Sequence, residues 1–508
     1  MKVAMKKLLT LQNLRRIYAI FFVLLFVILI FLTNFLYLQG YEIQLFFDLD
    51  PLVAITTFFT GGTLYKGLVL SVFVIIGTLF LGRFFCSWIC PLGIINHLIS
   101  FGFGKFSSSE STKLNAYRKT QRIKYYILIF SLILAFFGLL QIGLLDPIAL
   151  VTRSFIVSVF PAIQYWTGYL YLKQPLFQGG ILIGVVFVSI LLANRIIPRF
   201  WCRILCPLGA LLGLLSIFSL FRIRRNTEKC NDCKKCLQGC QGACEPFGEI
   251  RNNECLLCMN CISNCPEGAL HYGLATPESS IHKAIDIPRR RLIETTVVGL
   301  ALYPILKTVA NARTLPREKV IRPPGSIKED DFLSKCIKCS ECMKICPTNV
   351  LQPALLESGF EGLWTPVLKN RIGYCEHNCV LCGQVCPTGA ITPLQVVEKV
   401  GKAPDIKPMK IGTAFYDRGR CLPWAMNIPC IVCEEVCPTS PKAIWFQETT
   451  IDLRGGGSKR LKQPLLDPSR CIGCGICENK CPVQDPAAIR VTSVGETRST
   501  TNQMILNG

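Results

Sequence analysis

Residues 255–266 read C-L-L-C-M-N-C-I-S-N-C-P, four cysteines at the spacing C-x2-C-x2-C-x3-C with a proline directly after the last. The full spacing occurs four times, and two further groups keep only its C-x2-C-x3-C-P end. The regular groups are Cys230, Cys233, Cys236, Cys240; Cys255, Cys258, Cys261, Cys265; Cys336, Cys339, Cys342, Cys346; and Cys471, Cys474, Cys477, Cys481. The looser groups are Cys375, Cys379, Cys382, Cys386 and Cys421, Cys430, Cys433, Cys437. Together they use 24 of the 29 cysteines.

This spacing is typical of bacterial proteins that hold [4Fe–4S] clusters, in which three close thiolates wrap one cluster and the fourth reaches its neighbour. Zinc is the alternative for any single set of four cysteines, but six sets in series, five of them ending in C-x3-C-P, favour clusters. Disulfides are disfavoured because such closely spaced cysteines give poor bridge geometry. The sequence therefore predicts six [4Fe–4S] clusters, with the iron bound through these 24 cysteines.

The first two groups are separated by 14 residues, which predicts one compact two-cluster domain over residues 226–275. Crossed ligation assigns Cys230, Cys233, Cys236 and Cys265 to site A, and Cys255, Cys258, Cys261 and Cys240 to site B. Cys244 is left over, either as a small buried residue or as a replacement for Cys240, which lacks the following proline. The four later groups predict a four-cluster domain over residues 331–490, in which the order of pairing stays open.

The chain before residue 226 is strongly apolar, in keeping with 51% hydrophobic and only 17% charged residues overall. Four runs have about the length that crosses a ~30 Å hydrocarbon core as a helix: Ile17–Leu38, Gly67–Phe85, Tyr125–Leu145 and Gly180–Ile197. Lys and Arg cluster on the flanks that would then be cytoplasmic. The predicted fold class is a membrane α-helical domain of four spans over residues 1–225, joined to small α+β bacterial-ferredoxin-like domains. Because the net charge of +22 is largely explained by these flanks, no nucleic-acid partner is expected.

The apolar part contains two related copies. Residues 83–93, R-F-F-C-S-W-I-C-P-L-G, match residues 199–209, R-F-W-C-R-I-L-C-P-L-G, and Asp50-Pro51 matches Asp146-Pro147. We expect each Asp-Pro pair to be a helix N-cap followed by proline at the first helical position. The copies also carry the remaining C-x3-C-P pairs, Cys86 with Cys90 and Cys202 with Cys206. Three readings of these four stay open: a shared metal or cluster site, redox-active thiols, or structural cysteines.

A fifth hydrophobic segment lies at Leu292–Ala312, within the region 288–312, and is preceded by Arg289, Arg290 and Arg291. Twin arginines before a moderate apolar stretch are typical of the export signal for folded proteins, and the alternative is a basic helix on the membrane surface. Residues 313–330 are predicted as a linker and residues 491–508 as a flexible tail. The chain is thus expected to be a multi-pass protein of the cytoplasmic membrane with an extracytoplasmic C-terminal domain.

Residues 1–275 resemble NapH-type, NosR-like and FixG-like polyferredoxin membrane proteins, through the two RF[FW]C-x3-CPLG motifs and Cys230–Cys265. Residues 288–490 resemble exported ferredoxins of the NapG/MauM type, through the twin-arginine start, the Arg322–Gly325 stretch R-P-P-G and four cysteine groups in series. The chain therefore resembles a fusion of two partners. It departs from the pattern in the front spacing of two groups and in Cys240-Gln241 in place of Cys-Pro, so only the electron-transfer role is carried over.

These features predict an electron relay between the quinone pool and redox partner proteins, embedded in membrane lipid and without substrate chemistry of its own. A quinone is a further expected cofactor, because the C-x3-C-P pairs and sites A and B would all lie at the inner face of a ~30 Å core. Two alternatives stay open. One is a factor that supplies electrons to mature a metalloenzyme or reduce a metal ion, and the other is a membrane-anchored cytoplasmic polyferredoxin.

Overall fold

The computed structural model describes residues 10–36, 43–62, 65–102, 108–167, 177–248, 250–275, 288–313, 320–401, 407–452, 457–484 and 486–503. The chain divides into two compact units. Unit 1 comprises Met1–Leu32, Gly40–Val159 and Gly180–Ile305, and unit 2 comprises Thr33–Gln39, Phe160–Gly179 and Leu306–Gly508. The division falls inside the region 288–312, which forms the helix α16 (Arg289–Arg313).

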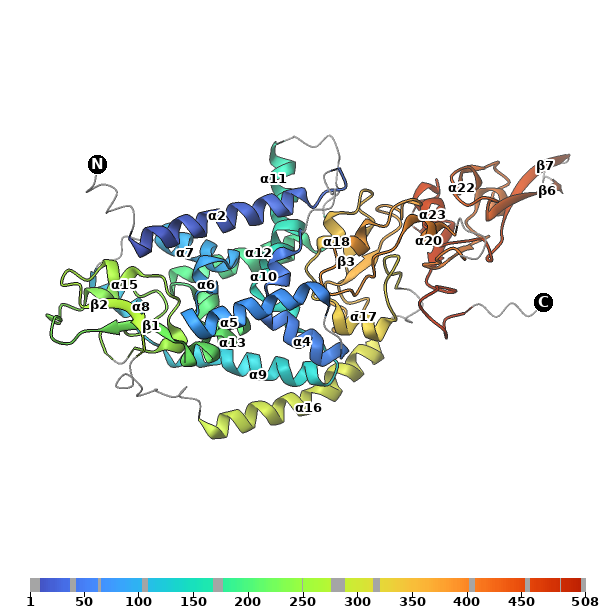
Figure 1. Ribbon diagram of the computed structural model, residues 1–508. Helices are drawn as coiled ribbons and strands as arrows, with labels where there is room; N and C mark the ends of the chain where they lie inside the picture. Colours follow the sequence, from blue (N-terminus) through green and yellow to red (C-terminus); the bar gives the residue numbers. More distant parts are fainter. Residues whose placement is uncertain are drawn as a thin grey trace. The chain divides into compact units, whose positions relative to one another are not determined.

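Unit 1 is mainly helical (Figure 1). Its α-helices, besides α16, are α2 (Leu11–Leu32), α3 (Leu45–Asp48), α4 (Pro51–Gly61), α5 (Ser71–Leu81), α6 (Phe85–Trp88), α7 (Pro91–Gly102), α8 (Ser108–Asn115), α9 (Ile123–Phe136), α10 (Pro147–Ser154), α12 (Gly180–Leu192), α13 (Pro207–Leu215), α14 (Lys235–Gln238) and α15 (Asn260–Ser263). π-Helical segments, Phe155–Val159 and Trp201–Leu205, continue α10 and precede α13.

The two copies begin equivalent helices in the same way. The Asp50 carboxylate accepts hydrogen bonds from the backbone N–H groups of Leu52 (2.8 Å) and Val53 (3.3 Å) at the start of α4. Asp146 does the same for Ile148 (3.0 Å) and Ala149 (2.8 Å) at the start of α10. The predicted N-caps followed by proline are confirmed.

The prediction of four membrane spans is corrected. Within the described residues, only α2, with 22 residues, and the continuous stretch Pro147–Trp166, with 20, are long and apolar enough to cross a bilayer, and a buried core helix or a signal sequence has the same properties. The run at 67–85 is cut by Gly82, whose φ of +87° ends α5 after 11 residues. The runs at 125–145 and 180–197 give α9 with 14 residues and α12 with 13. Hydropathy recorded the composition of these runs but not the breaks within them.

The two-cluster region of unit 1 lies between two paired strands, β1 (Phe221–Arg225) and β2 (Leu270–Leu274), which are antiparallel with Ile223 opposite Tyr272. Ile223, Leu257, Met259 and Leu270 form a small hydrophobic core with cysteines of both groups. The other buried members of this core are Cys240, Cys244, Cys255 and Cys261, so cysteines supply half of it.

Unit 2 combines short helices with two-stranded antiparallel sheets. Its helices are α11 (Phe160–Thr167), α17 (Glu329–Lys335), α18 (Glu341–Lys344), α19 (Leu381–Gln384), α20 (Val396–Val400), α21 (Leu422–Ala425), α22 (Val432–Glu435) and α23 (Ile476–Lys480). Its sheets pair β3 (Leu351–Pro353) with β4 (Pro366–Leu368), β5 (Thr413–Tyr416) with β8 (Ile489–Thr492), and β6 (Ile444–Asp452) with β7 (Ser458–Leu466).

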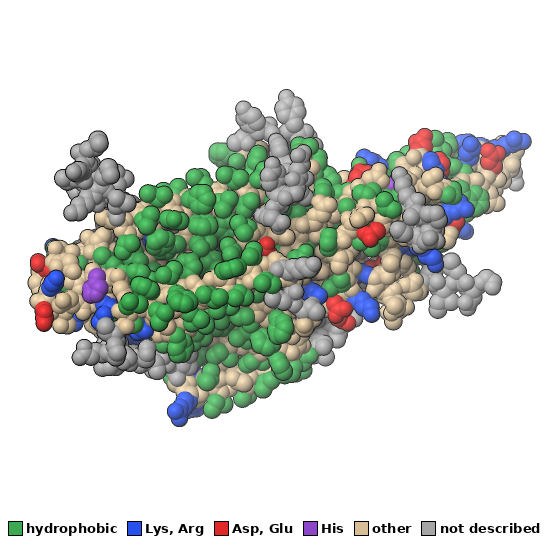
Figure 2. Space-filling model, viewed as in Figure 1, with side chains coloured by type: hydrophobic (Ala, Val, Ile, Leu, Met, Phe, Trp, Pro, Cys, Tyr) green, Lys and Arg blue, Asp and Glu red, His purple; other side chains and the backbone are tan. Residues whose placement is uncertain are grey.

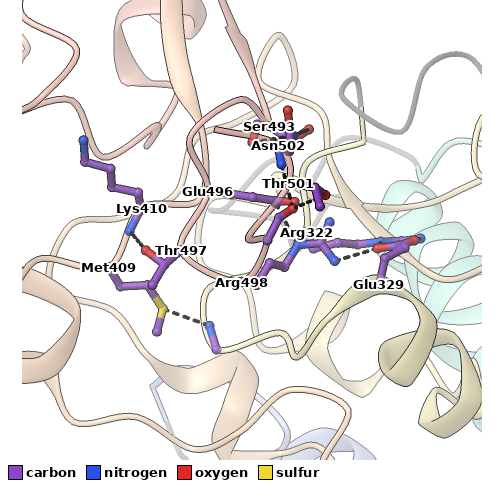
Figure 3. Close-up of polar contacts among 12 residues, drawn as sticks. Arg322, Glu329, Met409, Lys410, Ser493, Glu496, Thr497, Arg498, Thr501 and Asn502 are labelled. Atoms are coloured by element: carbon purple, nitrogen blue, oxygen red, sulfur yellow. Dashed lines mark hydrogen bonds and ion pairs between the residues drawn. The ribbon is translucent and has the colours of Figure 1, made fainter. Parts of the chain in front are cut away.

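Parts of the segments predicted as linker and flexible tail form polar contacts within unit 2 (Figure 3). Arg322 is buried and pairs with Glu329, at 2.6 Å between Nη2 and Oε1. Arg498 pairs with the other oxygen of Glu329, also at 2.6 Å. Asn502 donates to the carbonyl of Ser493 at 3.0 Å. These ion pairs hold the two ends of the domain together, and residues 314–319 and 504–508 lie outside the described residues.

Candidate iron–sulfur sites

The four regular cysteine groups share one unusual backbone feature. The residues directly before and after the second cysteine are left-handed: Asp232 and Lys234, Leu257 and Met259, Lys338 and Ser340, Gly473 and Gly475, with φ from +49° to +78°. Left-handed φ is strained for a residue with a Cβ. Such turns direct successive backbone N–H groups into one concavity that suits an anion, as at many iron–sulfur sites. The loops therefore fit an anionic cluster.

In unit 2 the cysteines converge in crossed sets. A hollow of about 360 Å³ is lined by Cys375, Cys379, Cys382 and Cys346. A second, of about 340 Å³, is lined by Cys471, Cys474, Cys477 and Cys437. A third, of about 350 Å³, is lined by Cys421, Cys430, Cys433 and Cys481. The fourth set is Cys336, Cys339 and Cys342, whose thiols interact electrostatically with Cys386.

We name these sites C (Cys336, Cys339, Cys342, Cys386), D (Cys375, Cys379, Cys382, Cys346), E (Cys471, Cys474, Cys477, Cys437) and F (Cys421, Cys430, Cys433, Cys481). The geometry pairs the groups in chain order, first with second and third with fourth, a point that the sequence left open. The two pairs meet where the Cys375 N–H donates to the Cys474 carbonyl at 2.8 Å. The sites are thus connected in the order C, D, E, F.

In unit 1 the cysteines of the second group lie near Cys240. The thiols of Cys258 and Cys261 both interact electrostatically with Cys240, as the crossed assignment of site B requires. For site A, Cys236 and Cys265 pack against the same hydrophobic core. Cys244 lies beside Cys240, with 3.3 Å between the sulfur atoms, and its backbone N–H points to the Cys240 sulfur at 3.3 Å. Cys244 is therefore placed as a hydrogen-bond donor to Cys240.

The two C-x3-C-P pairs come together as well. Cys86, Cys90, Cys202 and Cys206 are all buried, and the Cys206 thiol interacts electrostatically with the other three. Arg83 donates from Nε to the Cys86 sulfur at 3.2 Å and from Nη2 to the Cys202 carbonyl at 3.3 Å. The Gly209 N–H donates to the Cys206 sulfur at 3.2 Å. We call this the four-thiol site. Burial raises the pKa of Cys206 well above its usual range, so in the absence of a bound cation its thiol is protonated.

The described cysteines fit clusters better than single ions. Among the residues that the structure describes, no three Cys, His, Asp or Glu side chains converge as the ligands of one metal ion do. A single zinc ion would require such convergence. In a [4Fe–4S] cube each thiolate binds a different iron, so the sulfur atoms stand further apart. All described cysteines are free thiols.

Two contacts connect site B with the four-thiol site. Trp88, between Cys86 and Cys90, donates from its indole N–H to the carbonyl of Leu257 at 3.1 Å, and Leu257 directly precedes Cys258. Gln241, which stands where a proline is usual, accepts from Arg199 Nε at 3.1 Å and contacts the His97 ring at 2.5 Å. The unusual Cys240-Gln241 step thereby attaches the two-cluster region to the helical part of unit 1.

Three further residues that contact cysteine sulfur atoms were not predicted from the sequence. The buried Lys399 donates to the Cys375 sulfur at 3.3 Å, and the Tyr416 hydroxyl lies 3.2 Å from the Cys433 sulfur. Thr439 lies 3.3 Å from the Cys437 sulfur. Only the threonine has a sequence signal, because Cys-Pro-Thr ends three of the four groups in unit 2.

Two families with iron–sulfur descriptions match parts of the chain. A family described as "4Fe-4S binding domain" matches residues 63–108 and 177–226, which contain the two C-x3-C-P motifs. A second family with the same description matches residues 332–352 and 464–484. Fold and sites together define an iron–sulfur, ferredoxin-type electron-transfer protein.

Similar curated proteins place the chain more closely. The methylamine utilization ferredoxin-type protein MauM of Methylorubrum extorquens is 35% identical over 201 residues, 39% of this chain and 81% of that protein. The ferredoxin-type proteins NapG and NapF of Escherichia coli are 34% and 33% identical, over 33% and 32% of this chain and 68% and 80% of their own lengths. The chain belongs to this family of ferredoxin-type proteins. No solved structure matches.

Proposed function

We propose that this chain is a membrane-bound electron relay that holds six [4Fe–4S] clusters at sites A to F and a seventh at the four-thiol site. The observation that carries the proposal is that cysteines of two different groups line each hollow in unit 2, in crossed sets. When bound, such clusters transfer single electrons. The protein supplies the cysteine ligands, donates hydrogen bonds to their sulfur atoms and excludes water.

The seventh site is supported by the match of an iron–sulfur family to both of its halves and by the convergence of the four thiols. Its test is the iron content of anaerobically purified protein. Seven four-iron clusters give about 28 iron atoms and six give about 24. Cys206→Ser should remove about four, whereas Cys244→Ser, which alters a buried cysteine outside the proposed ligand sets, should remove none. An equal iron content in wild type and Cys206→Ser would exclude the seventh cluster.

Membrane binding is supported by the surface of unit 1. Large hydrophobic side chains are exposed along α2, α5 and α12, among them Phe21 (57%), Phe73 (69%) and Ile181 (80%). Figure 2 shows hydrophobic side chains gathered over α2 and α5. An apolar area of this extent is typical of a membrane or protein contact. The N-terminal helix α2 supplies the length to span the bilayer.

The fusion of NapH/NosR/FixG-like and NapG/MauM-like parts gives the relay two candidate ports, one at sites A and B and one at sites C to F. We assign the quinone pool and redox partner proteins as its donors and acceptors, with the residues after 312 outside the cytoplasm. A C-terminal tag should then be cut by protease added to spheroplasts, and Arg289→Lys/Arg290→Lys should protect it. If the tag were protected from protease in both strains, the protein would be a membrane-anchored cytoplasmic polyferredoxin.

A maturation role is the second candidate, because the four-thiol site gathers four buried cysteines, and thiolates are the ligands that soft metal ions prefer. Deleting the gene and assaying a partner metalloenzyme distinguishes the relay from the maturation role. A partner metalloenzyme that is fully metallated but cannot draw electrons from quinol supports the relay. A partner that lacks its metal supports maturation.

A further inference from the structure

The two copies in unit 1 bring their Asp-Pro pairs together. Asp50 and Asp146 are both fully buried, and their carboxyl groups lie close enough to interact directly. One oxygen of each carboxyl caps its own helix, as described above. The other oxygens, Oδ2 of Asp50 and Oδ1 of Asp146, accept no hydrogen bond from any N–H or hydroxyl group among the described residues. What remains for these two oxygens is the contact with each other.

A contact of this kind requires a proton. An ionised carboxylate only accepts hydrogen bonds, whereas a protonated carboxyl has one O–H to donate. Two ionised carboxylates in direct contact and out of water would repel each other and would each lose their hydration. Each helix N-terminus favours negative charge at its cap, which opposes the protonation of both groups. One proton and one negative charge satisfy these conditions together.

We propose that Asp50 and Asp146 form a proton-binding site that holds a single proton between the two repeats. Among the described residues, no third Cys, His, Asp or Glu side chain joins the two carboxyls in a metal-ligand group. Its symmetry follows from the duplicated sequence, since each copy contributes one carboxyl and one helix N-terminus.

The charged groups around the pair leave its remaining charge only partly balanced. Arg153, on the same helix as Asp146, donates to the carbonyls of Gly143 at 3.0 Å and Leu144 at 3.3 Å. Of the other elements packed against α4 and α10, α3 carries Asp48, α7 carries His97 and α9 carries Lys124. Lys124 is paired with Glu254, and His97 lies between Arg15 and Gln241.

The pair is also close enough to the four-thiol site for the Cys90 thiol to interact electrostatically with Asp146. Added negative charge among the four sulfurs would therefore favour a second proton on the pair, drawn from solvent. This response rests on the proposed function, because an electron reaches the four-thiol site only if that site holds a cluster. The shared proton itself does not depend on the proposed function.

The test uses infrared spectroscopy of the full-length protein in lipid nanodiscs, in which a protonated carboxylic acid has its own carbonyl band. Wild type should show a deuterium-sensitive band at neutral pH that Asp50→Asn and Asp146→Asn each remove. Asparagine caps helices about as well as aspartate, so both variants should keep their iron content and melting temperature. Asp48→Asn is the matched control and should keep the band.

The proposal is overturned if no single band disappears in both Asp50→Asn and Asp146→Asn. It is also overturned if Asp48→Asn removes that band. Reduction with dithionite tests the link to the four-thiol site, because the band should gain intensity in wild type and in Asp48→Asn only. A band that is present but unchanged on reduction would overturn this link and leave the shared proton established.

Discussion

The backbone N–H of Cys375 donates a 2.8 Å hydrogen bond to the carbonyl oxygen of Cys474. These cysteines belong to sites D and E and are 99 residues apart in sequence, so this hydrogen bond joins the two pairs of sites. The same contact places site C and site F at opposite ends of a chain of four. Electrons that enter at one end of this chain have a defined order of carriers to follow.

The order rests on crossed pairing, which a serine substitution can test. Cys481 lines the hollow with Cys421, Cys430 and Cys433 rather than with the cysteines of its own group. Cys481→Ser should therefore perturb site F and leave site E intact, and Cys437→Ser should do the reverse. EPR spectra of the reduced proteins check this, with a loss of up to about four iron atoms in each variant. If both substitutions perturbed the same cluster, the crossed assignment would be wrong.

Lys399 should raise the reduction potential of site D. Its ammonium group donates to the Cys375 sulfur at 3.3 Å and to the carbonyl of Cys379 at 2.7 Å. A positive charge and a hydrogen bond on sulfur both stabilise the reduced cluster. Lys399→Met should lower one midpoint potential by on the order of 60 mV, the one-electron equivalent of about 1.4 kcal/mol.

Potentiometric titration followed by EPR measures this change. Lys442→Met is the matched control, because the Lys442 side chain is 41% exposed and pairs with Glu434. We expect no shift beyond the error of the titration in that variant. A similar fall in both variants would mean that overall charge, and not the contact with Cys375, sets the potential.

Cys240 and Cys244 should differ in their roles at site B. Cys244 lies beside the Cys240 sulfur and directs its own N–H toward it. Cys244→Ala should keep the cluster and shift its potential, because a sulfur contact is lost. Cys240→Ala should remove about four iron atoms, unless Cys244 replaces it as a ligand. Iron analysis of both variants and of the double variant separates the two cases, since replacement would show as iron loss only in the double variant.

The sequence identifies short motifs and helix caps but not long-range partners. The cysteine groups and the Asp50 and Asp146 caps are encoded within a few residues, so spacing alone identifies them. Gln241 shows the opposite case, because its partner His97 is 144 residues away and nothing in the sequence joins them. Lys399 is placed against Cys375 by the turn from α19 to α20, whose course depends on tertiary packing.

The number of membrane spans was over-predicted for a physical reason. An apolar run gives the composition of a segment, whereas a span also needs about 20 continuous helical residues. Gly82, in a left-handed conformation that suits glycine, ends one such run early. Asp146 and Pro147 begin the helix α10 directly after another of these apolar runs, Tyr125–Leu145.

Glu329 should contribute a pH-dependent part of the stability of unit 2. Burial alone would raise its pKa, but the charges of and hydrogen bonds from Arg322 and Arg498 lower it to about 2. Because the folded pKa lies below the unfolded value of about 4.3, this stabilisation is fully present above pH ~4.3 and is lost as the pH falls toward 2. Glu329→Gln leaves the buried Arg322 without its carboxylate and should lower the free energy of unfolding at pH 7 by about 3 kcal/mol.

Thermal unfolding of the full-length protein at a series of pH values checks this prediction. The difference between wild type and Glu329→Gln should be constant from pH 7 to about pH 5 and should shrink below it, because protonated Glu329 resembles glutamine. Glu434→Gln removes the partner of Lys442, in a pair whose side chains are 27% and 41% exposed, and should cost less than about 1 kcal/mol. A difference for Glu329→Gln that stayed constant down to pH 3 would show that the ion pairs with Arg322 and Arg498 do not hold its pKa down. The loss of stability would then come from packing alone.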